Sequence, residues 1–321
     1  MAILAGIDEA GYGPLLGPLV VSASVFRLPD EMADECLWEA LAGAVTRRAF
    51  RKSPALPLAD SKVMRVRTEG LIHLDRGVLG MLRQLGQTPR TFAELLRLMA
   101  PGMEGQMGGY PWYAGADLPL PRQADATDLA LRANAVAEAM RRRGMSLEAI
   151  RAEPVLAGKY NRLVGATRNK SVALFGVTSQ LIWEVFSTHA GAEPTRIVAD
   201  RQGGRIRYLR YLQQMFEGAA IRVIEESDRR SAYLIRDGRR QVEISFLTGA
   251  EDRSLPVALA SMVSKYVREL FMELLNRWWA GRIEDLKPTA GYYTDGQRFL
   301  RDIDRAIAAE GVDKSLLVRS R

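Results

Sequence analysis

Residues 2–21 read AILAGIDEAGYGPLLGPLVV, and within them two adjacent acids, Asp8 and Glu9, stand between an apolar run and a glycine-rich turn. The apolar run predicts a short buried strand, and the apolar residues after the turn predict a second one. Adjacent side chains of a strand point to opposite faces, so both acids reach one centre only if the strand breaks directly after Glu9. Gly11 and Gly13 permit such a break. The pattern indicates a metal-binding active site, with a solvated acidic turn as the alternative.

Composition indicates a globular protein with a polyanionic partner. The 321 residues are 47% hydrophobic, enough for a large core. No apolar run predicts a membrane span or a signal peptide, so we expect a cytoplasmic protein without membrane association. Because there is one cysteine, Cys36, and only two histidines, any metal is expected to be Mg²⁺ or Mn²⁺ held by oxygens. The net charge of +7 suits a partner rich in phosphate.

The first half of the chain contains a segment that interrupts the pattern of strands and helices. The apolar spacing of residues 63–85 predicts a helix, with Ser61 as its N-cap. Residues 100–121 are rich in glycine and proline and predict a long irregular loop. Residues 125–143 then predict another helix. We therefore expect residues 86–145 to form an insertion or small subdomain.

A further acid stands at the end of a predicted strand in the second half of the chain. The sequence TRIVAD (residues 195–200) predicts a strand that ends at Asp200, and a pair of glycines follows it. Residues 221–247 alternate apolar and polar side chains around Asp237-Gly238, which predicts an antiparallel ribbon with a two-residue turn. Two acids at strand ends are more informative than one, because neighbouring strands bring their ends together.

Another pair of acids, Glu251 and Asp252, follows this ribbon and precedes a long helix with a proline in its first turn. On that helix Ser261 and Lys265 are four residues apart and share a face. One acid of the pair completes a set of four carboxylates with those at the two strand ends. Four carboxylates repel one another and stay ionised only around cations. Two divalent ions about 4 Å apart activate water and stabilise the leaving oxygen of a phosphodiester, so the set predicts a nuclease without a side-chain nucleophile.

Five motifs follow one another along most of the chain. They are DEAGYGPLLGP (residues 8–18), ADSK (59–62), IVAD (197–200), DRSLPVALASMVSK (252–265) and GYYT (291–294). In content and order they resemble the type 2 ribonucleases H, the family of ribonuclease HII, whose opening motif reads DEAGRGPLAGP. That family also has an ADSK element, a strand ending in Val-Asp, an acid and a proline before a helix reading SAASxxAK, and a late Gly-Tyr before a Thr.

The resemblance implies an RNase H-like fold of the α/β class, with helices on either side of a mixed five-stranded sheet. It implies a catalytic core over residues 1–85 and 146–280, interrupted by the insertion at 86–145, and a C-terminal helical substrate-contact region over 281–321. It also implies hydrolysis with two Mg²⁺ or Mn²⁺ ions. The implied substrate is the RNA strand of RNA/DNA hybrids, or ribonucleotides embedded in duplex DNA, and the resemblance names no protein partner.

Carried over position by position, the resemblance assigns the acids to the metal ions and the other motif residues to the substrate. Asp8, Glu9 and Asp200 resemble the family's catalytic metal ligands. For the fourth ligand, the distance from the helix lysine favours Glu251, and the distance from the proline favours Asp252, which we prefer because the family uses aspartate. The residues expected to bind substrate are Gly11, Tyr12, Gly13, Ser61, Lys62, Ser261, Lys265 and Tyr292.

The turn departs from the family because Tyr12 stands where the family has arginine. The family's turn offers backbone groups to the ribose 2′-hydroxyl at an RNA/DNA junction, which Gly11 and Gly13 can preserve, while a tyrosine can stack on a sugar or base. Two alternatives therefore stay open: a relative that acts on another nucleic acid, and a nucleic-acid-binding protein without catalysis. A loop that cradles a mononucleotide is disfavoured, since acids precede the glycines. Trp278 and Trp279 are interpreted as core or interface residues.

Overall fold

A mixed β-sheet forms the centre of the computed structural model, which describes residues 1–48, 53–64, 69–191 and 193–320. Within these residues the sheet has seven strands in the order β5-β2-β1-β6-β9-β8-β7. Strand β6 runs parallel to β1 and β9, and the other neighbouring pairs are antiparallel. The bounds are β1 (Ala2–Ala10), β2 (Leu19–Leu28), β5 (Ser146–Val155), β6 (Thr195–Asp200), β7 (Ala220–Glu226), β8 (Arg230–Asp237) and β9 (Arg240–Leu247).

The expected mixed sheet with flanking helices is confirmed, but the expectation of five strands is wrong. The antiparallel ribbon predicted after residue 220 is confirmed as β7, β8 and β9, but β9 also pairs along its length with β6, so the ribbon adds strands to the same sheet. The hairpin turn also lies one residue later than expected. Asp237 still pairs with Arg240, so Gly238 and Arg239 form the turn. A separate pair of two-residue strands, β3 (Val45–Thr46) and β4 (Leu56–Pro57), lies outside this sheet.

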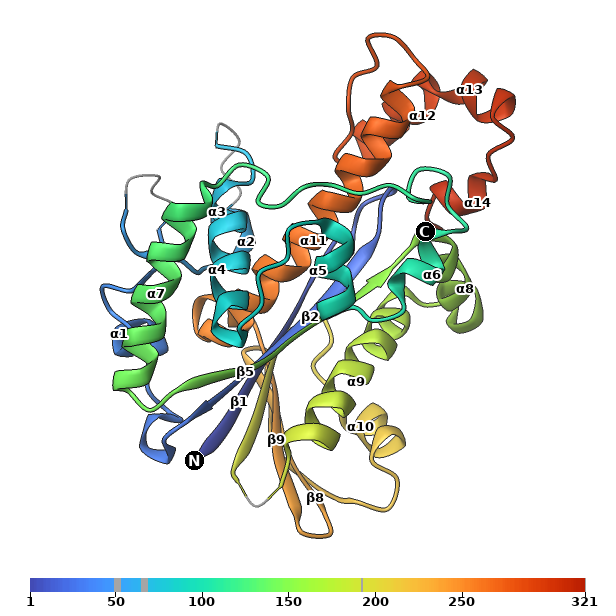
Figure 1. Cartoon of the computed structure of the whole chain (residues 1–321). Helices are drawn as coiled ribbons and strands as arrows, with labels where there is room; N and C mark the ends of the chain where they lie inside the picture. The colour runs from blue at the N-terminus through green and yellow to red at the C-terminus, as the bar shows by residue number, and fades with distance from the viewer. Residues whose placement is uncertain (49–52, 65–68, 192, 321) are drawn as a thin grey trace.

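Helices cover both faces of the sheet and give two apolar cores (Figure 1). On one face lie α11 (Leu255–Ala280), α5 (Phe92–Met99) and α7 (Ala126–Arg142), and on the other lie α8 (Ala157–Thr167), α9 (Lys170–His189) and α10 (Leu209–Met215). The strands supply both cores because their side chains alternate: Ile3, Ala5 and Ile7 of β1 join the core beneath α9. Among the described helices, none is both long and apolar enough to cross a membrane.

Helix α11 packs directly on the middle of β1, and a glycine makes this possible. A Cβ atom on Gly6 would lie 2.1 Å from the backbone nitrogen of Val257 and 2.6 Å from the carbonyl oxygen of Pro256. The first turn of α11 therefore lies against the backbone of β1, two residues before Asp8. Ser24 of β2 donates a hydrogen bond to the same Pro256 carbonyl, at 2.8 Å. This close packing fixes the N-terminal end of α11 beside the acids of the opening motif.

The helix predicted for residues 63–85 is present in several pieces, and residues 65–68 of it lie outside the described part. Helix α2 (Ser61–Met64) comes first. After the gap, α3 (Ile72–Leu74), a π-helical turn (Asp75–Leu79), α4 (Gly80–Leu82) and a 3₁₀ turn (Arg83–Leu85) form one continuous run. Asp60, not Ser61, caps the start, because its Oδ1 accepts the N–H of Lys62 at 3.0 Å. Ser61 is thereby left free to turn its hydroxyl inward.

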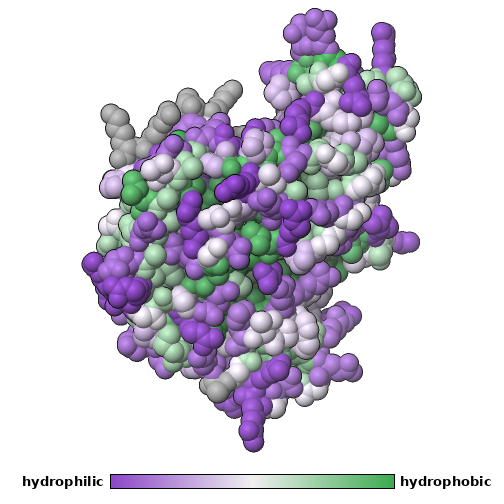
Figure 2. All heavy atoms as spheres, in the orientation of Figure 1, coloured by the Kyte–Doolittle hydropathy of each residue, from purple (hydrophilic) through white to green (hydrophobic). Residues whose placement is uncertain are grey.

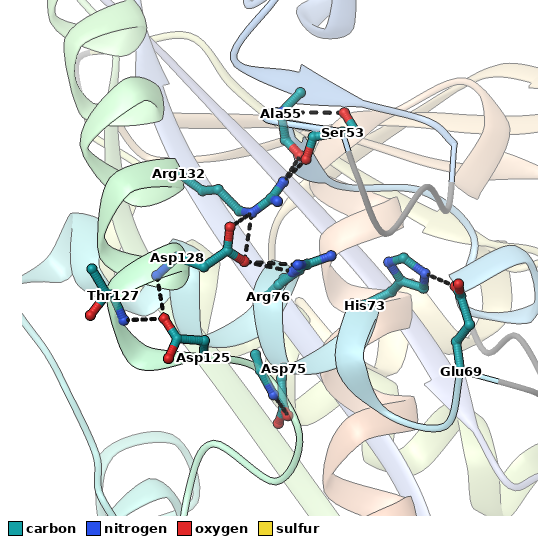
Figure 3. A network of polar contacts seen from close by, with 11 residues as sticks. Ser53, Ala55, Glu69, His73, Asp75, Arg76, Asp125, Thr127, Asp128 and Arg132 are labelled. Carbon is teal, nitrogen blue, oxygen red and sulfur yellow. Dashed lines mark hydrogen bonds and ion pairs between the residues drawn. The ribbon is translucent and has the colours of Figure 1, made fainter.

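The segment expected to be an insertion packs closely against α11 and the run at 72–85. Figure 3 shows Asp128 of α7 between two arginines, with the Nε atoms of Arg76 and Arg132 both 2.9 Å from its carboxylate oxygens. Asp75 accepts the hydroxyl of Tyr266 at 2.5 Å and the N–H groups that precede α7. The predicted irregular loop contains α6 (Met103–Met107) and buries its aromatic residues: Trp112 packs on Trp278 and Trp279. The domain boundaries themselves stay a prediction.

The C-terminal helices extend from the end of α11 and then return to the body of the protein. Figure 1 shows α12 (Tyr293–Asp302) and α13 (Asp304–Ala309) projecting at the top, and α14 (Lys314–Leu317) bringing the chain back beside α8. Hydrophilic side chains are spread over the visible face of this projection, as over the rest of the surface in Figure 2. The remaining short elements are α1 (Leu37–Ala40) and a 3₁₀ turn (Asp30–Met32). Past α14, the N–H of Arg319 donates to the carbonyl of Leu15 at 2.9 Å, so this segment lies against the opening motif.

Candidate active site

The ends of β1 and β6 lie side by side and carry two of the predicted acids. The parallel register pairs Ile7 with Ala199, so Asp8 and Asp200 are the next residues along the two neighbouring strands. The main-chain N–H of Ala250 donates to Oδ1 of Asp200 at 3.0 Å, which attaches the turn before α11 to the same strand end. The register of the sheet therefore brings together acids that are far apart in the sequence.

Glu9 also reaches this centre, although the chain does not break where we expected. Strand β1 continues to Ala10, and Glu9 still pairs with Val21 of β2. The expected break directly after Glu9 is therefore one residue too early. The carboxyl group of Glu9 nevertheless feels the charges of Asp200 and Glu251 strongly. Its position near the strand end allows a long side chain to reach across to acids on the neighbouring elements.

Of the two candidates for the fourth acid, the structure places Glu251 in the cluster and Asp252 outside it. Both lie in a 3₁₀ turn (Ala250–Asp252), in which successive side chains point about 120° apart, so only one of the two faces inward. Glu251 is 8% exposed, and its Oε1 lies 3.5 Å from Nζ of Lys62. Asp252 is exposed and is not among the leading charges that act on the other acids. The geometry thus favours the alternative over our preference from the sequence.

Burial and mutual repulsion raise the pKa values of three of the four acids. Burial, then the charge of Glu9, raises the pKa of Asp8 well above its usual range. Burial, then the charges of Asp200 and Glu251, raises the pKa of Glu9 from 4.5 to about 8. Burial also raises the pKa of Glu251, and Asp200 adds to the effect. Such a cluster favours either protons or a bound cation in place of full negative charge.

The ADSK motif and α11 supply polar groups around the acids. The hydroxyls of Ser61 and Ser261 lie 3.1 Å apart, both side chains are buried, and Ser261 also hydrogen-bonds the carboxyl group of Asp8. Burial acts to lower the pKa of Lys62, but Asp60 and Glu251 outweigh it and leave that pKa raised. The Lys62 side chain is largely exposed, so a permanent positive charge stands at the rim of the acid cluster.

Two residues expected at the substrate lie further from the acids. Nζ of Lys265 pairs with Oε1 of Glu269 one turn along α11, at 2.7 Å, rather than with the cluster. Tyr292 is 54% exposed and follows Gly291, whose carbonyl accepts the N–H groups of Leu15 and Leu16 at 2.8 and 3.1 Å. Tyr292 therefore flanks the glycine-rich loop, where an exposed ring is able to stack on a nucleotide.

The donor set fits a divalent cation, although its atoms are not gathered around one point. Among the described residues, no three Asp, Glu, His or Cys side chains are placed to hold a single ion. However, Oε2 of Glu251 is buried and has no hydrogen-bond partner there. A buried carboxylate oxygen without a donor is costly, and a hard cation such as Mg²⁺ or Mn²⁺ satisfies it. With Asp8, Glu9 and Asp200 beside it, the site offers only oxygen ligands.

The glycine turn of the opening motif lies beside the acids and is held by two buried arginines that sequence reasoning missed. Gly11 has a positive φ of 87°, and a Cβ there would lie 2.6 Å from the carbonyl oxygen of Pro18. Arg268 of α11 donates to the carbonyl of Leu16 at 3.1 Å. Arg319, near the C-terminus, donates to the carbonyls of Gly11 and Tyr12. The sequence could have revealed Arg268, because an arginine on the apolar face of a helix is unusual. The tail sequence contains no comparable signal that Arg319 is buried.

Comparison with known proteins finds solved structures only. No family model and no curated protein matches the sequence. The chain is similar to solved ribonucleases HII and HIII. They include ribonuclease HII from Archaeoglobus fulgidus in a complex with PCNA, 16% identical, with a TM-score of 0.44 over 99% of this chain and 94% of that one.

Two further structures are similar at the same level. Bst-RNase HIII in complex with Mn²⁺ is 17% identical, with a TM-score of 0.45 over 99% of this chain and 66% of that one. Ribonuclease H2 from Pyrococcus horikoshii OT3 is 14% identical, with a TM-score of 0.40 over 98% of this chain and 92% of that one. At these identities and TM-scores the similarity carries no weight for activity. The functional argument therefore rests on the side chains of the site.

Proposed function

We propose that this chain is a metal-dependent endonuclease of the type 2 ribonuclease H kind, acting in the cytoplasm. Its substrate is the RNA strand of an RNA/DNA hybrid, or a ribonucleotide embedded in duplex DNA. The observation that carries the proposal is the assembly of Asp8, Glu9, Asp200 and Glu251 from three separate elements into one cluster, with a buried carboxylate oxygen that lacks a partner. The motif resemblance supports the choice of substrate.

In this mechanism the four acids would hold two Mg²⁺ or Mn²⁺ ions. Bound ions of this kind activate a water molecule and stabilise the leaving oxygen of the scissile phosphodiester. The hydrogen bond from Ser261 orients Asp8, and the N–H of Ala250 orients Asp200. Lys62, charged and exposed beside Glu251, would attract a substrate phosphate to the edge of the cluster.

The groups at and beside the glycine turn suit a nucleic acid rather than a small molecule. Tyr292, exposed beside the glycine turn, provides a ring on which a sugar or base would stack, whereas Tyr12 is half-buried and packs on the core beneath α9. The basic character of the chain favours phosphate binding in general. Because a tyrosine occupies the middle of the turn, a preference for another nucleic acid is the second candidate. It is tested with the same assay.

The test is cleavage of a labelled RNA/DNA hybrid with Mg²⁺ or Mn²⁺, and with a chelator as the control. Asp8→Asn and Asp200→Asn are expected to lower kcat about 10³-fold or more, since each removes a charge needed to hold the ions. Glu251→Gln is expected to have a comparable effect. Asp252→Asn, the adjacent exposed acid, serves as the matched control and should keep activity within about twofold.

A panel of substrates separates the candidates. It comprises an RNA/DNA hybrid, a DNA duplex with one ribonucleotide, plain DNA and structured RNA. Cleavage of plain DNA alone would reject the proposed substrate while keeping a metal-dependent nuclease. Salt-dependent binding of the hybrid without any metal requirement, and with no cleavage, would indicate a binding protein and overturn the catalytic proposal.

A further inference from the structure

The last residues of the chain bring a buried arginine to the glycine turn. Arg319 is 3% exposed, its Nη1 donates to the carbonyl of Gly11, and its Nη2 donates to the carbonyl of Tyr12 at 3.1 Å. Its guanidinium carbon lies 3.8 Å from the centroid of the Tyr160 ring of α8. Within the described part of the chain, no carboxylate forms an ion pair with it. Two backbone carbonyls and Tyr160 thus surround the guanidinium, and the charge of Arg268 also acts on it.

The tail that carries Arg319 is fixed on both sides of this residue. The N–H of Arg319 donates to the carbonyl of Leu15 at 2.9 Å, directly after the turn. Asn161 of α8 donates to the carbonyls of Ser315 and Val318, both at 2.8 Å, and accepts the N–H of Ser320 at 2.6 Å. The backbone that carries Arg319 is therefore held on both sides, and its own hydrogen bonds to Gly11 and Tyr12 then fix the guanidinium.

Holding these two carbonyls determines where the neighbouring N–H groups point. In a trans peptide the C=O and the next N–H point in opposite directions. Fixing the carbonyls of Gly11 and Tyr12 on buried Arg319 therefore directs the N–H groups of Tyr12 and Gly13 away from it. Among the described residues, no group of the protein accepts either N–H. Gly13 is exposed, and a Cβ placed on it would meet nothing within 4 Å, so this side of the turn is open.

The open side of the turn belongs to the same region as the acids. Tyr12 follows Glu9 by three residues, and burial, with a contribution from the charge of Glu9, raises the pKa of the Tyr12 hydroxyl. The charge of Arg319 also acts on this hydroxyl and opposes the rise in its pKa. Two consecutive N–H groups beside a carboxylate cluster form a binding site for an oxygen atom of a substrate held there.

We propose that Arg319 is a positioning residue for the substrate: it holds the turn so that the N–H groups of Tyr12 and Gly13 bind a sugar or phosphate oxygen of the nucleic acid. This inference rests on the proposed function. It makes the C-terminal tail part of the substrate site, although the tail does not touch the acids. Loss of the guanidinium should therefore weaken substrate binding without changing the metal centre.

The experiment compares Arg319→Met and Arg319→Lys with Arg132→Met. Arg132 of α7 is the control for loss of a buried arginine: it is also buried, at 6% exposure, and also donates to two backbone carbonyls, those of Ser53 and Ala55, although it pairs with Asp128 in addition. Asn161→Ala is a second test, because it removes the side chain that holds the tail backbone while the arginine at position 319 is retained. For each variant, KM and kcat on the RNA/DNA hybrid, the dissociation constant for the hybrid, the Mn²⁺ midpoint and the melting temperature are measured.

Arg319→Met is expected to raise KM and the dissociation constant about tenfold, with kcat and the Mn²⁺ midpoint within about twofold of the wild type. Arg319→Lys should recover part of this loss, and Asn161→Ala should show a smaller change in the same direction. Arg132→Met should lower the melting temperature without changing KM.

Equal hybrid binding by Arg319→Met and the wild type would overturn the inference, as would equal increases in KM for Arg319→Met and Arg132→Met. A wild type that binds the hybrid but does not cut it would count against the proposed function only, because the binding comparison still tests Arg319.

Discussion

Replacing Glu9 by glutamine should make the metal-free protein more stable at alkaline pH while it abolishes cleavage. The carboxyl group has a pKa of 4.5 in an ordinary environment and about 8 in the folded protein, because it is buried beside Asp200 and Glu251. Below pH 4.5 it is protonated in both the folded and the unfolded states. As the pH rises from 4.5 to about 8, the unfolded state ionises first, so the wild type loses stability. Glutamine does not ionise and avoids this loss.

The size of the effect follows from the shift in pKa. A rise from 4.5 to about 8 is roughly 3.5 units, and each unit is about 1.36 kcal/mol, which gives an upper limit of about 5 kcal/mol. Although the carboxyl group is largely withdrawn from bulk water, the Glu9 residue is only half-buried at the strand end, so water still screens part of the repulsion. We therefore expect Glu9→Gln to stabilise the metal-free protein by about 2–3 kcal/mol above pH 8, and by much less at pH 5.

Urea unfolding in the presence of a chelator measures this difference at pH 5 and pH 9. Exposed Glu217→Gln is the control and should change the free energy of unfolding by less than about 0.5 kcal/mol at both pH values. Saturating Mg²⁺ should stabilise the wild type more than the variant, because the ion takes the place of the protons on the clustered acids and Glu9 is one of its expected ligands. An identical stability difference between wild type and Glu9→Gln at pH 5 and pH 9 would refute the reasoning.

Two further predictions concern metal binding and packing. The apparent affinity for Mn²⁺ should rise as the pH increases between about 4.5 and 8, because protons on Asp8 and Glu9 compete with the ion. Calorimetry in two buffers of different ionisation enthalpy should detect the protons that are released when Mn²⁺ binds. If no protons are released, the raised pKa values are contradicted. Gly6→Ala should destabilise the protein by about 3 kcal/mol, since the new methyl would lie 2.1 Å from the nitrogen of Val257. Gly176→Ala within α9, where nothing lies within 4 Å, should instead stabilise it by about 0.5–1 kcal/mol, and equal effects of the two changes would refute the packing argument.

Local sequence patterns predicted the individual elements well and their assembly less well. The strand at residues 195–200 and the helix at 125–143 correspond to Thr195–Asp200 and Ala126–Arg142, because alternation, helical spacing and caps act within a few residues. The extent of the sheet was underestimated, because pairing of β9 with β6 depends on strands about 45 residues apart. Nothing in the local pattern distinguishes a separate ribbon from one that continues a sheet.

The sequence could not choose between Glu251 and Asp252 for a related reason. Counting from Pro256 or from Lys265 gives different answers, since the count assumes a regular spacing that a 3₁₀ turn does not keep. The structure decides by burial and by the contact with Lys62, both of which depend on the first turn of α11 lying against Gly6. The motif therefore indicates which segment offers the fourth acid, and tertiary packing decides which of its two acids lies in the cluster.

The two halves of the site differ in how they are encoded, and this explains which part the sequence reveals. The acids sit in short motifs at the ends of strands, where register alone brings Asp8 and Asp200 together, so the motifs by themselves indicate their chemistry. The turn that would contact the substrate depends on Arg268 and Arg319, the second of which is more than 300 residues from the Gly11 carbonyl to which it donates. A change in the tail can therefore alter substrate binding without touching any residue of the motif. Substrate preference is then expected to vary with the C-terminal segment, while the catalytic acids stay the same.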